Sequence, residues 1–141
     1  MKTIILYYSL GGTSKKKAEQ IAERNENVVL CEVEEIKKRN IFTSFIPGCP
    51  HAMKRKASTI KPLNYELSDY DRIVIVCPVW ANFPAPAFNA VIELLPAEKE
   101  VEIYMCSGSG GSQKSEQGTK DMVTGKNCIL VGYHDVKANS V

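Results

Sequence analysis

The sequence has no apolar run near the roughly 20 residues that a membrane-spanning helix requires. Its apolar opening, residues 1–8, is not followed by a small-residue cleavage site of the kind that ends a secretory signal. These residues therefore read as a first strand, and we expect a cytoplasmic protein without a membrane partner. A length of 141 residues fits one domain, 1–141, with a core that needs no structural metal.

Cysteine and histidine are too sparse and too scattered for a disulfide framework or a metal site. The five cysteines are an odd number, and four lie within or at the end of apolar runs: Cys31, Cys77, Cys106 and Cys128. Buried, reduced thiols are the better interpretation. Cys49 stands near His51, but the only other histidine, His134, is far along the chain. We therefore predict no metal site.

Net charge is only +2, but it is unevenly distributed. Residues 37–64 carry seven basic side chains and no carboxylate. Two interpretations stay open: a solvated basic loop, or a docking surface for an anionic ligand or an acidic protein partner. Nucleic acid is not expected as a partner, because few aromatic side chains accompany these charges.

Short apolar runs alternate with helical periodicity along the chain. The expected strands are 3–8, 28–33, 72–77, 101–106 and 128–131. The expected helices are 14–24, 86–95 and 112–124, with a short one near 51–57. The third run is apolar at every position after Arg72, as in strands covered on both faces. The pattern predicts an α/β fold with a doubly wound, five-stranded parallel sheet.

The expected fold lacks a clear C-terminal fifth helix, because only about ten residues follow the last predicted strand. We expect part of one sheet face to be apolar and uncovered. Either a second subunit, as in a homodimer, covers that face, or the sequence is shortened.

Three loops of unusual composition follow the predicted strands, at the sheet edge where such folds bind ligands. The first joins hydroxyls and glycines to a helix start, which suits a phosphate group but also an ordinary capped turn. The second contains Trp80, the only tryptophan, as a stacking platform or a hydrophobic plug. The third is glycine-rich, for close backbone approach or as a flexible linker. The candidate binding residues are Ser9, Leu10, Gly11, Gly12, Thr13, Ser14, Pro78, Val79, Trp80, Ala81, Asn82, Phe83, Ser107, Gly108, Ser109 and Gly110.

Other nucleotide sites and hydrolytic chemistry are disfavoured. The sequence has no Gly-Lys-Thr or Gly-Lys-Ser and no GxGxxG, which excludes the usual triphosphate and dinucleotide loops. Near the three loops there is no Ser-His-Asp, Cys-His or paired-carboxylate arrangement. We therefore assign no catalytic residue.

In this ordered combination the three loops resemble the flavodoxin-like family over about residues 2–135. Residues 8–14 (Tyr-Ser-Leu-Gly-Gly-Thr-Ser) resemble its phosphate loop, 69–81 its third strand and first isoalloxazine loop, and 107–111 its second isoalloxazine loop. The resemblance implies a strand order of 2-1-3-4-5 and FMN bound noncovalently at the switch point, the arrangement of flavodoxin itself. The sequence departs from the family pattern at Gly11, where the family usually has a threonine.

The resemblance implies a redox protein, either an electron carrier or an NAD(P)H-dependent FMN or quinone reductase. Carriers of this family are typically acidic, whereas residues 78–86 and 106–115 contain no Asp or Glu. We therefore expect a reduction potential less negative than that of an acidic carrier. The basic 37–64 segment is the expected site for NAD(P)H or an acidic redox partner. A third alternative is a flavodoxin-like binding module without flavin.

Overall fold

The computed structural model describes residues 1–40 and 47–141 of the chain. Residues 41–46, which belong to the predicted basic docking segment 37–64, lie outside the described residues. None of the helices in the described ranges is long and apolar enough to cross a membrane.

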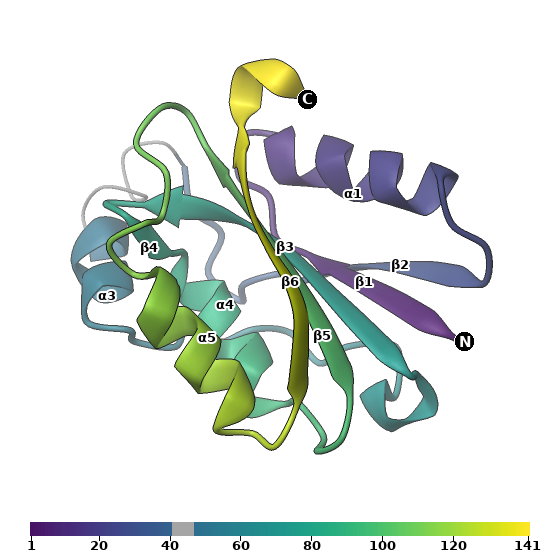
Figure 1. The fold of residues 1–141 in the computed structure, drawn as a ribbon. Helices are drawn as coiled ribbons and strands as arrows, with labels where there is room; N and C mark the ends of the chain where they lie inside the picture. The colour runs from purple at the N-terminus through teal and green to yellow at the C-terminus, as the bar shows by residue number, and fades with distance from the viewer. Residues whose placement is uncertain (41–46) are drawn as a thin grey trace.

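A central parallel sheet organises the molecule (Figure 1). Its five long strands are β1 (Thr3–Tyr7), β2 (Val28–Glu32), β3 (Arg72–Trp80), β5 (Glu100–Ser107) and β6 (Ile129–Lys137). Their order is β2-β1-β3-β5-β6, and every neighbouring pair is parallel. With the short β4 (Phe83–Pro84) set aside, this is the predicted order 2-1-3-4-5. The prediction of a doubly wound α/β sheet is confirmed.

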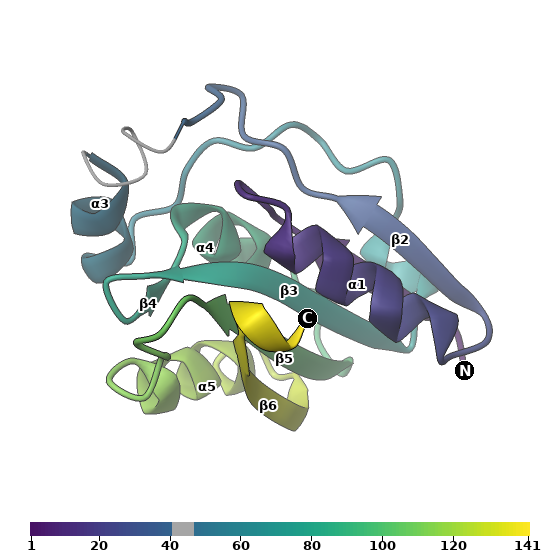
Figure 2. The same ribbon diagram turned by 90° about the horizontal axis from the view of Figure 1, so that it is seen from above.

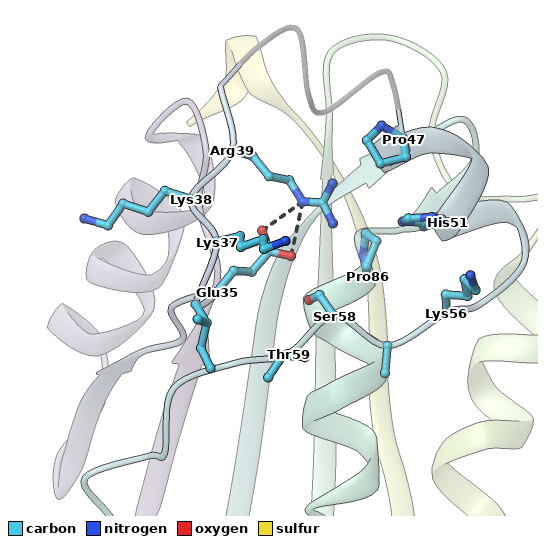
Figure 3. A pocket seen from close by; sticks show the side chains of 12 residues that line it. Glu35, Lys37, Lys38, Arg39, Pro47, His51, Lys56, Ser58, Thr59 and Pro86 are labelled. Atoms are coloured by element: carbon cyan, nitrogen blue, oxygen red, sulfur yellow. Dashed lines mark hydrogen bonds and ion pairs between the residues drawn. The ribbon is translucent and has the colours of Figure 1, made fainter.

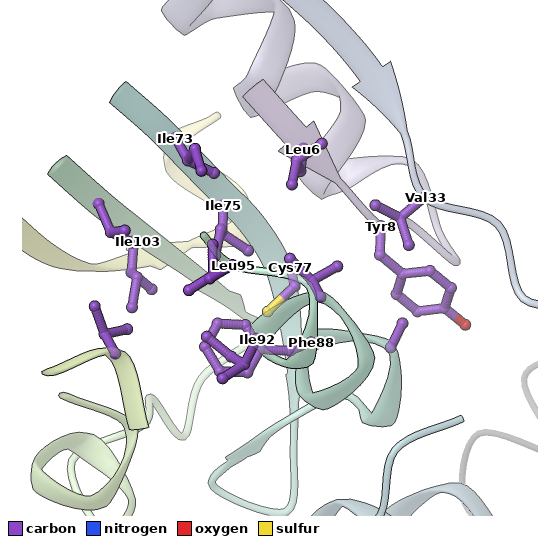
Figure 4. Packing of buried hydrophobic residues seen from close by; sticks show 14 of the residues in the cluster. Leu6, Tyr8, Val33, Ile73, Ile75, Cys77, Phe88, Ile92, Leu95 and Ile103 are labelled. Atoms are coloured by element: carbon purple, nitrogen blue, oxygen red, sulfur yellow. The ribbon is translucent and has the colours of Figure 1, made fainter. Parts of the chain in front are cut away.

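Helices cover both faces of the sheet, as Figure 2 shows: α1 lies on one face, and α4 and α5 on the other. The α-helices are α1 (Thr13–Glu23), α3 (Cys49–Met53), α4 (Pro86–Glu93) and α5 (Glu116–Thr124), and short 3₁₀ turns span Leu67–Asp69 and Ala138–Ser140. The larger core lies between the sheet and α4, where Phe88 and Ile92 pack against Ile75 and Ile103 (Figure 4). Four of the five cysteines are buried, as predicted.

The first correction concerns 78–86, which the sequence predicted as a loop. Strand β3 continues to Trp80, turns at Ala81 and Asn82, and returns as β4, with Trp80 opposite Phe83. The two turn residues have φ of 53° and 70°, the left-handed conformation of a tight hairpin turn. Because such turns usually contain glycine, the Ala-Asn pair gave no turn signal, and the three prolines nearby indicated a loop.

The chain after β5 also differs from expectation. Helix α5 begins at Glu116 instead of residue 112, because Ser112–Ser115 form a separate turn closed by a hydrogen bond from the Ser115 amide to the Ser112 carbonyl (3.0 Å). Strand β6 runs to Lys137 instead of ending at residue 131. Elsewhere the boundaries move by one to four residues: α1 starts at 13, α3 occupies 49–53 instead of 51–57, and α4 ends at 93.

The part of the sheet that α1 does not cover is mixed in character: β6 exposes Ile129 and Val131, as expected of an uncovered apolar face, beside polar and aromatic side chains. Among the described residues α1 is the only α-helix on its face, and it packs over β1, β2 and β3. Beyond it, β5 and β6 present Glu102, Tyr104 and His134. The His134 Nε2 atom lies 2.8 Å from Glu102 Oε2, and the Tyr104 and His134 rings stack at 4.3 Å. Polar and aromatic side chains therefore share this surface with the exposed hydrophobic side chains of β6.

Candidate functional site

The three predicted loops meet in one pocket of about 290 Å³, at the carboxyl ends of β1, β3 and β5. Ten predicted residues line it: Ser9, Leu10, Gly11, Thr13, Ser14, Pro78, Val79, Trp80, Ser107 and Gly108. Parallel strands place their carboxyl ends at one edge, so loops distant in sequence become neighbours. Two further lining residues, Cys106 and Ala138, were not predicted.

The first loop is shaped by Gly12, whose φ of 95° suits glycine better than any other residue. The Gly12 amide donates a hydrogen bond to Ser9 Oγ (2.9 Å), which folds the loop back onto itself. Helix α1 begins at the next residue, so its first amide groups, which have no partner within the helix, lie at this loop. The arrangement concentrates hydrogen-bond donors and the positive end of the helix dipole at the pocket.

Ser14 is the most informative residue of this loop. Its side chain is 1% exposed, and its Oγ atom has no hydrogen-bond partner in the part of the chain that the structure describes. Its polar neighbour is the Cys106 thiol: burial raises the pKa of that thiol, and its side-chain interaction with Ser14 offsets part of the rise. Because a thiol is only a weak hydrogen-bonding group, the buried Ser14 hydroxyl is poorly satisfied by the protein and can bind a stronger acceptor.

Trp80 is held between two other side chains. The Tyr8 ring meets it edge-on, with ring centres 6.1 Å apart, and the Arg39 guanidinium lies over its ring at 5.4 Å. Glu35, 5% exposed, joins the two supports: it accepts a hydrogen bond from the Tyr8 hydroxyl and pairs with Arg39 at 2.9 Å. Burial and the bond to Glu35 raise the pKa of Tyr8. The network fixes Trp80 as one wall of the pocket.

Hydrogen bonds of serine side chains hold the third loop at both ends, so this loop differs from a flexible linker. Ser107 Oγ accepts a hydrogen bond from the Gly111 amide (3.1 Å). The Ser112 hydroxyl lies 2.5 Å from Asp135 Oδ1, and the Ser112 amide bonds the same oxygen. Ser115 Oγ donates to the Asn82 carbonyl (2.5 Å), which ties this loop to the β3–β4 hairpin. The two loops that border the pocket are therefore mutually fixed.

Six predicted residues lie outside the lining of this pocket: Gly12, Ala81, Asn82, Phe83, Ser109 and Gly110. Gly12 lines an adjoining pocket of about 510 Å³, which shares Gly11, Thr13 and Ala138 with the first. Asn82 faces the third loop through its carbonyl, and the Phe83 ring lies beneath the Arg55 guanidinium at 5.2 Å. The turn and second half of the hairpin thus contact Ser115, just before α5, and Arg55, just after α3.

Arg55 belongs to the interior contacts and does not extend the basic surface expected at 37–64. Its guanidinium donates to Thr119 Oγ1 and to the Ser115 carbonyl, both at 3.1 Å. Burial lowers the pKa of Arg55. Its charge therefore stabilises the packing of the α3 region on α5.

The electrostatic character of the pocket comes from dipoles and lysines. In the described part of the chain no Asp or Glu lines it, and Lys15 and Lys16 line the adjoining pocket together with one carboxylate, Glu19. Nor do residues 1–40 and 47–141 contain a group of three His, Cys, Asp or Glu that could hold a metal ion. The pocket is suited to an anion at the α1 end and to a flat ring beside Trp80.

Sequence reasoning missed two residues that line the pocket. One of them could have been predicted from the sequence, and the other could not. Cys106 is the penultimate residue of β5 and shares a face with Glu100, Glu102 and Tyr104, so strict alternation would have placed it at the pocket edge. Ala138 follows the unexpectedly long β6 and gave no signal in the sequence.

Comparison with known structures identifies the fold. No protein-family model matches the sequence, and no curated protein matches it significantly. A flavoprotein from Lactobacillus acidophilus NCFM, crystallised in complex with FMN, superposes with a TM-score of 0.78 at 24% identity, over 95% of this chain and 92% of that one. The apo-form of the Lactobacillus acidophilus NCFM flavoprotein, determined by NMR, gives 0.71 at 25% identity, over 99% and 94%.

A more distant neighbour is the flavodoxin of Streptococcus pneumoniae TIGR4, with a TM-score of 0.60 at 10% identity, over 97% of this chain and 84% of that one. The chain therefore has the flavodoxin-like α/β fold. The resemblance that the three loop motifs carry is confirmed by these structures.

Proposed function

We propose that this chain binds FMN noncovalently in the three-loop pocket and acts as a redox protein through the bound flavin. The observation that carries the proposal is Ser14 Oγ, buried at the first turn of α1 with no well-formed hydrogen bond in the described chain and only the weakly bonding Cys106 thiol beside it. A phosphate group would supply the missing acceptor. The similar fold of a protein crystallised with FMN supports the same cofactor.

The residues present fit the two ends of FMN. The hydroxyls of Ser9, Thr13 and Ser14 and the first amides of α1 would hold the phosphate. Trp80 would pack beside the ring, and the backbone of Val79 and of residues 107–108 would border it. The adjoining pocket, continuous at Gly11, gives additional room beside α1. When bound, FMN supplies one- and two-electron chemistry, while the protein supplies position and electrostatics.

The charge of the pocket sets an expectation for the reduction potential. No carboxylate of the described chain lines the three-loop pocket itself, although Glu19 lines the adjoining pocket, so reduced, anionic flavin beside Trp80 would have no carboxylate in its immediate lining. We therefore propose a potential less negative than that of an acidic flavodoxin. A reductive titration of the FMN-loaded protein against dyes of known potential measures it, and a very low hydroquinone couple would contradict the proposal.

The decisive test compares FMN with riboflavin, which lacks the phosphate. Trp80 is the only tryptophan, so its fluorescence reports ligand binding beside it. FMN should quench this fluorescence, and Ser14→Ala should weaken FMN binding by about tenfold or more, the value of a hydrogen bond to a charged group. Riboflavin should bind more weakly and be nearly insensitive to Ser14→Ala. Equal losses for both ligands would mean that the phosphate is not held here.

The electron-carrier and reductase alternatives are separated in the same cuvette. Adding NADPH anaerobically to the FMN-loaded protein bleaches the flavin absorption within the mixing time if the protein is a reductase. A carrier would leave the spectrum unchanged until a redox partner is added. A protein that is colourless as purified and leaves added FMN unbound would favour the flavin-free binding module.

A further inference from the structure

A second, larger cavity of about 670 Å³ opens on the other side of the Glu35–Arg39 pair (Figure 3). It is bordered by the segment after β2, by α3, by the connection that follows α3, and by Pro86 at the start of α4. Its volume falls within the range of small-molecule sites. Two of its lining residues, Glu35 and Arg39, also belong to the network that supports Trp80. Both also line a smaller cleft that reaches Ser9 and Leu10 of the first loop, so the cavity lies next to the three-loop pocket.

The lining of this cavity is cationic. Lys37, Lys38, Arg39 and Lys56 face a single carboxylate among the described lining residues, Glu35, which Arg39 and Tyr8 already bind. The pKa of His51 is lowered, most by burial and further by the positive charges of Lys56, Arg39 and Lys54. An anion entering the cavity would be attracted by these charges.

The cavity also contains a buried hydroxyl without a partner. Ser58 Oγ is inaccessible to solvent and makes no hydrogen bond within the described chain, although its amide is bonded to the Pro86 carbonyl. The neighbouring Lys56 is fixed as well, because its carbonyl accepts a hydrogen bond from the Asn89 side chain of α4 (3.2 Å). The connection is thus held on α4 with Ser58 and Lys56 at the cavity.

We propose that this cavity binds an organic oxyanion, a phosphate or carboxylate attached to an apolar body. Lys56 and the Ser58 hydroxyl bind the charged group, and Pro47, Ala57 and Pro86 contact the apolar part. The site communicates with the three-loop pocket through Arg39, which lies over Trp80. A molecule bound there would lie on one side of the Arg39–Trp80 pair, with the proposed flavin on the other side. This is the arrangement expected of a second substrate of a redox protein.

The test uses phenyl phosphate as the probe and phenol as its uncharged counterpart. Calorimetric titration is performed on FMN-loaded protein, so that the first loop cannot take the phosphate, and on the apo-protein. Phenyl phosphate should bind in both, and phenol should bind at least tenfold more weakly. Lys56→Gln and Ser58→Ala should each weaken phenyl phosphate by about tenfold. Lys54→Gln, an exposed lysine two residues away that does not line the cavity, is the matched control and should have little effect.

The two proposals fail in different ways. Competition between phenyl phosphate and FMN, or loss of phenyl phosphate binding in Ser14→Ala but not in Lys56→Gln, would overturn the cavity site and place the anion in the first loop. Equal losses of phenyl phosphate affinity in Lys54→Gln and Lys56→Gln would mean that the anion is attracted by the basic surface in general and is not bound in this cavity. If FMN itself does not bind, the apo-protein series with the Lys56, Lys54 and Ser14 variants still decides the question.

Discussion

The two faces of the sheet are covered by helices to different extents, and β5 shows the difference within one strand. Ile103 is fully buried beneath α4 and α5, whereas the adjacent Tyr104 points to the face of α1 and meets Glu102 and His134. In contrast, β3 is apolar on both faces because helices cover both. In β3 and β5 the composition therefore follows the helix cover, whereas β6 exposes the apolar Ile129 and Val131.

The largest effect is expected from Ile103→Ala. Removing a fully buried isoleucine leaves a cavity, and we expect the free energy of unfolding to fall by about 2–5 kcal/mol. Tyr104→Ala, on the opposite face of the same strand, should cost less, about 1–2 kcal/mol, because the half-buried ring loses its stacking on His134, its contact with the Lys17 ammonium and the hydrogen bond from its hydroxyl to Glu102. Urea denaturation of both variants measures the difference. Equal losses would show that the α1 face is as tightly packed as the other.

Arg55→Met tests whether the covered face also depends on a polar anchor. The substitution removes the hydrogen bonds to Thr119 and to the Ser115 carbonyl and should destabilise the protein by about 1–3 kcal/mol. Lys54→Met, at the adjacent exposed position, is the control and should change little. Indistinguishable urea midpoints for the two variants would mean that α3 packs on α5 without this anchor.

Alkaline pH should weaken the polar face through Tyr104. Burial and the neighbouring Glu102 carboxylate raise the pKa of Tyr104 from 10.0 to about 12. Between these values the unfolded chain has released the proton that the folded protein retains, so ionisation favours unfolding and stability falls as pH rises. Below pH 10 the contribution is fully present. Tyr104→Phe should therefore lose less stability than the parent between pH 10 and 12, measured by urea midpoints. A parallel decline would contradict this role.

The smallest effect is expected at Arg72→Gln, also on the polar face. Arg72 pairs with Glu100 across β3 and β5 at 2.6 Å, but both side chains are about one-third exposed. Solvent screening limits such pairs to less than about 1 kcal/mol. Thermal unfolding with and without about 1 M salt should show a small difference between variant and parent that disappears at high salt. A loss that persists in salt would indicate packing by the arginine stem.

The strand order and the position of the pocket could be predicted because both follow from local patterns. The apolar β3 run and the helical spacing of Phe88, Val91 and Ile92 each indicate one element, and the parallel topology brings the loops together. The β3–β4 hairpin could not be predicted, since Ala81 and Asn82 adopt left-handed conformations that neighbouring contacts stabilise. The length of β6 depends on its pairing with β5, and this pairing cannot be inferred from the residues of β6 alone.

The supports of the pocket were beyond sequence reasoning for the same reason. Glu35 reads as one of several acids after the second strand, and only the fold shows that it joins Tyr8 to Arg39 around Trp80. Arg55 reads as part of a basic run, yet its guanidinium is used in the packing of α5. Long polar side chains reach partners distant in sequence, so their surroundings cannot be inferred from neighbouring residues.

The turn at Ala138–Ser140 has a practical consequence for work with this protein. Ala138 lines the three-loop pocket, and Val141 lines the adjoining pocket with Gly11 and Lys15. Any residues joined after Val141 would emerge at the mouth of these pockets, where an affinity tag would obstruct the entry of a ligand. Met1 begins at the opposite end of the sheet (Figure 1), so fusions and immobilisation are best made there.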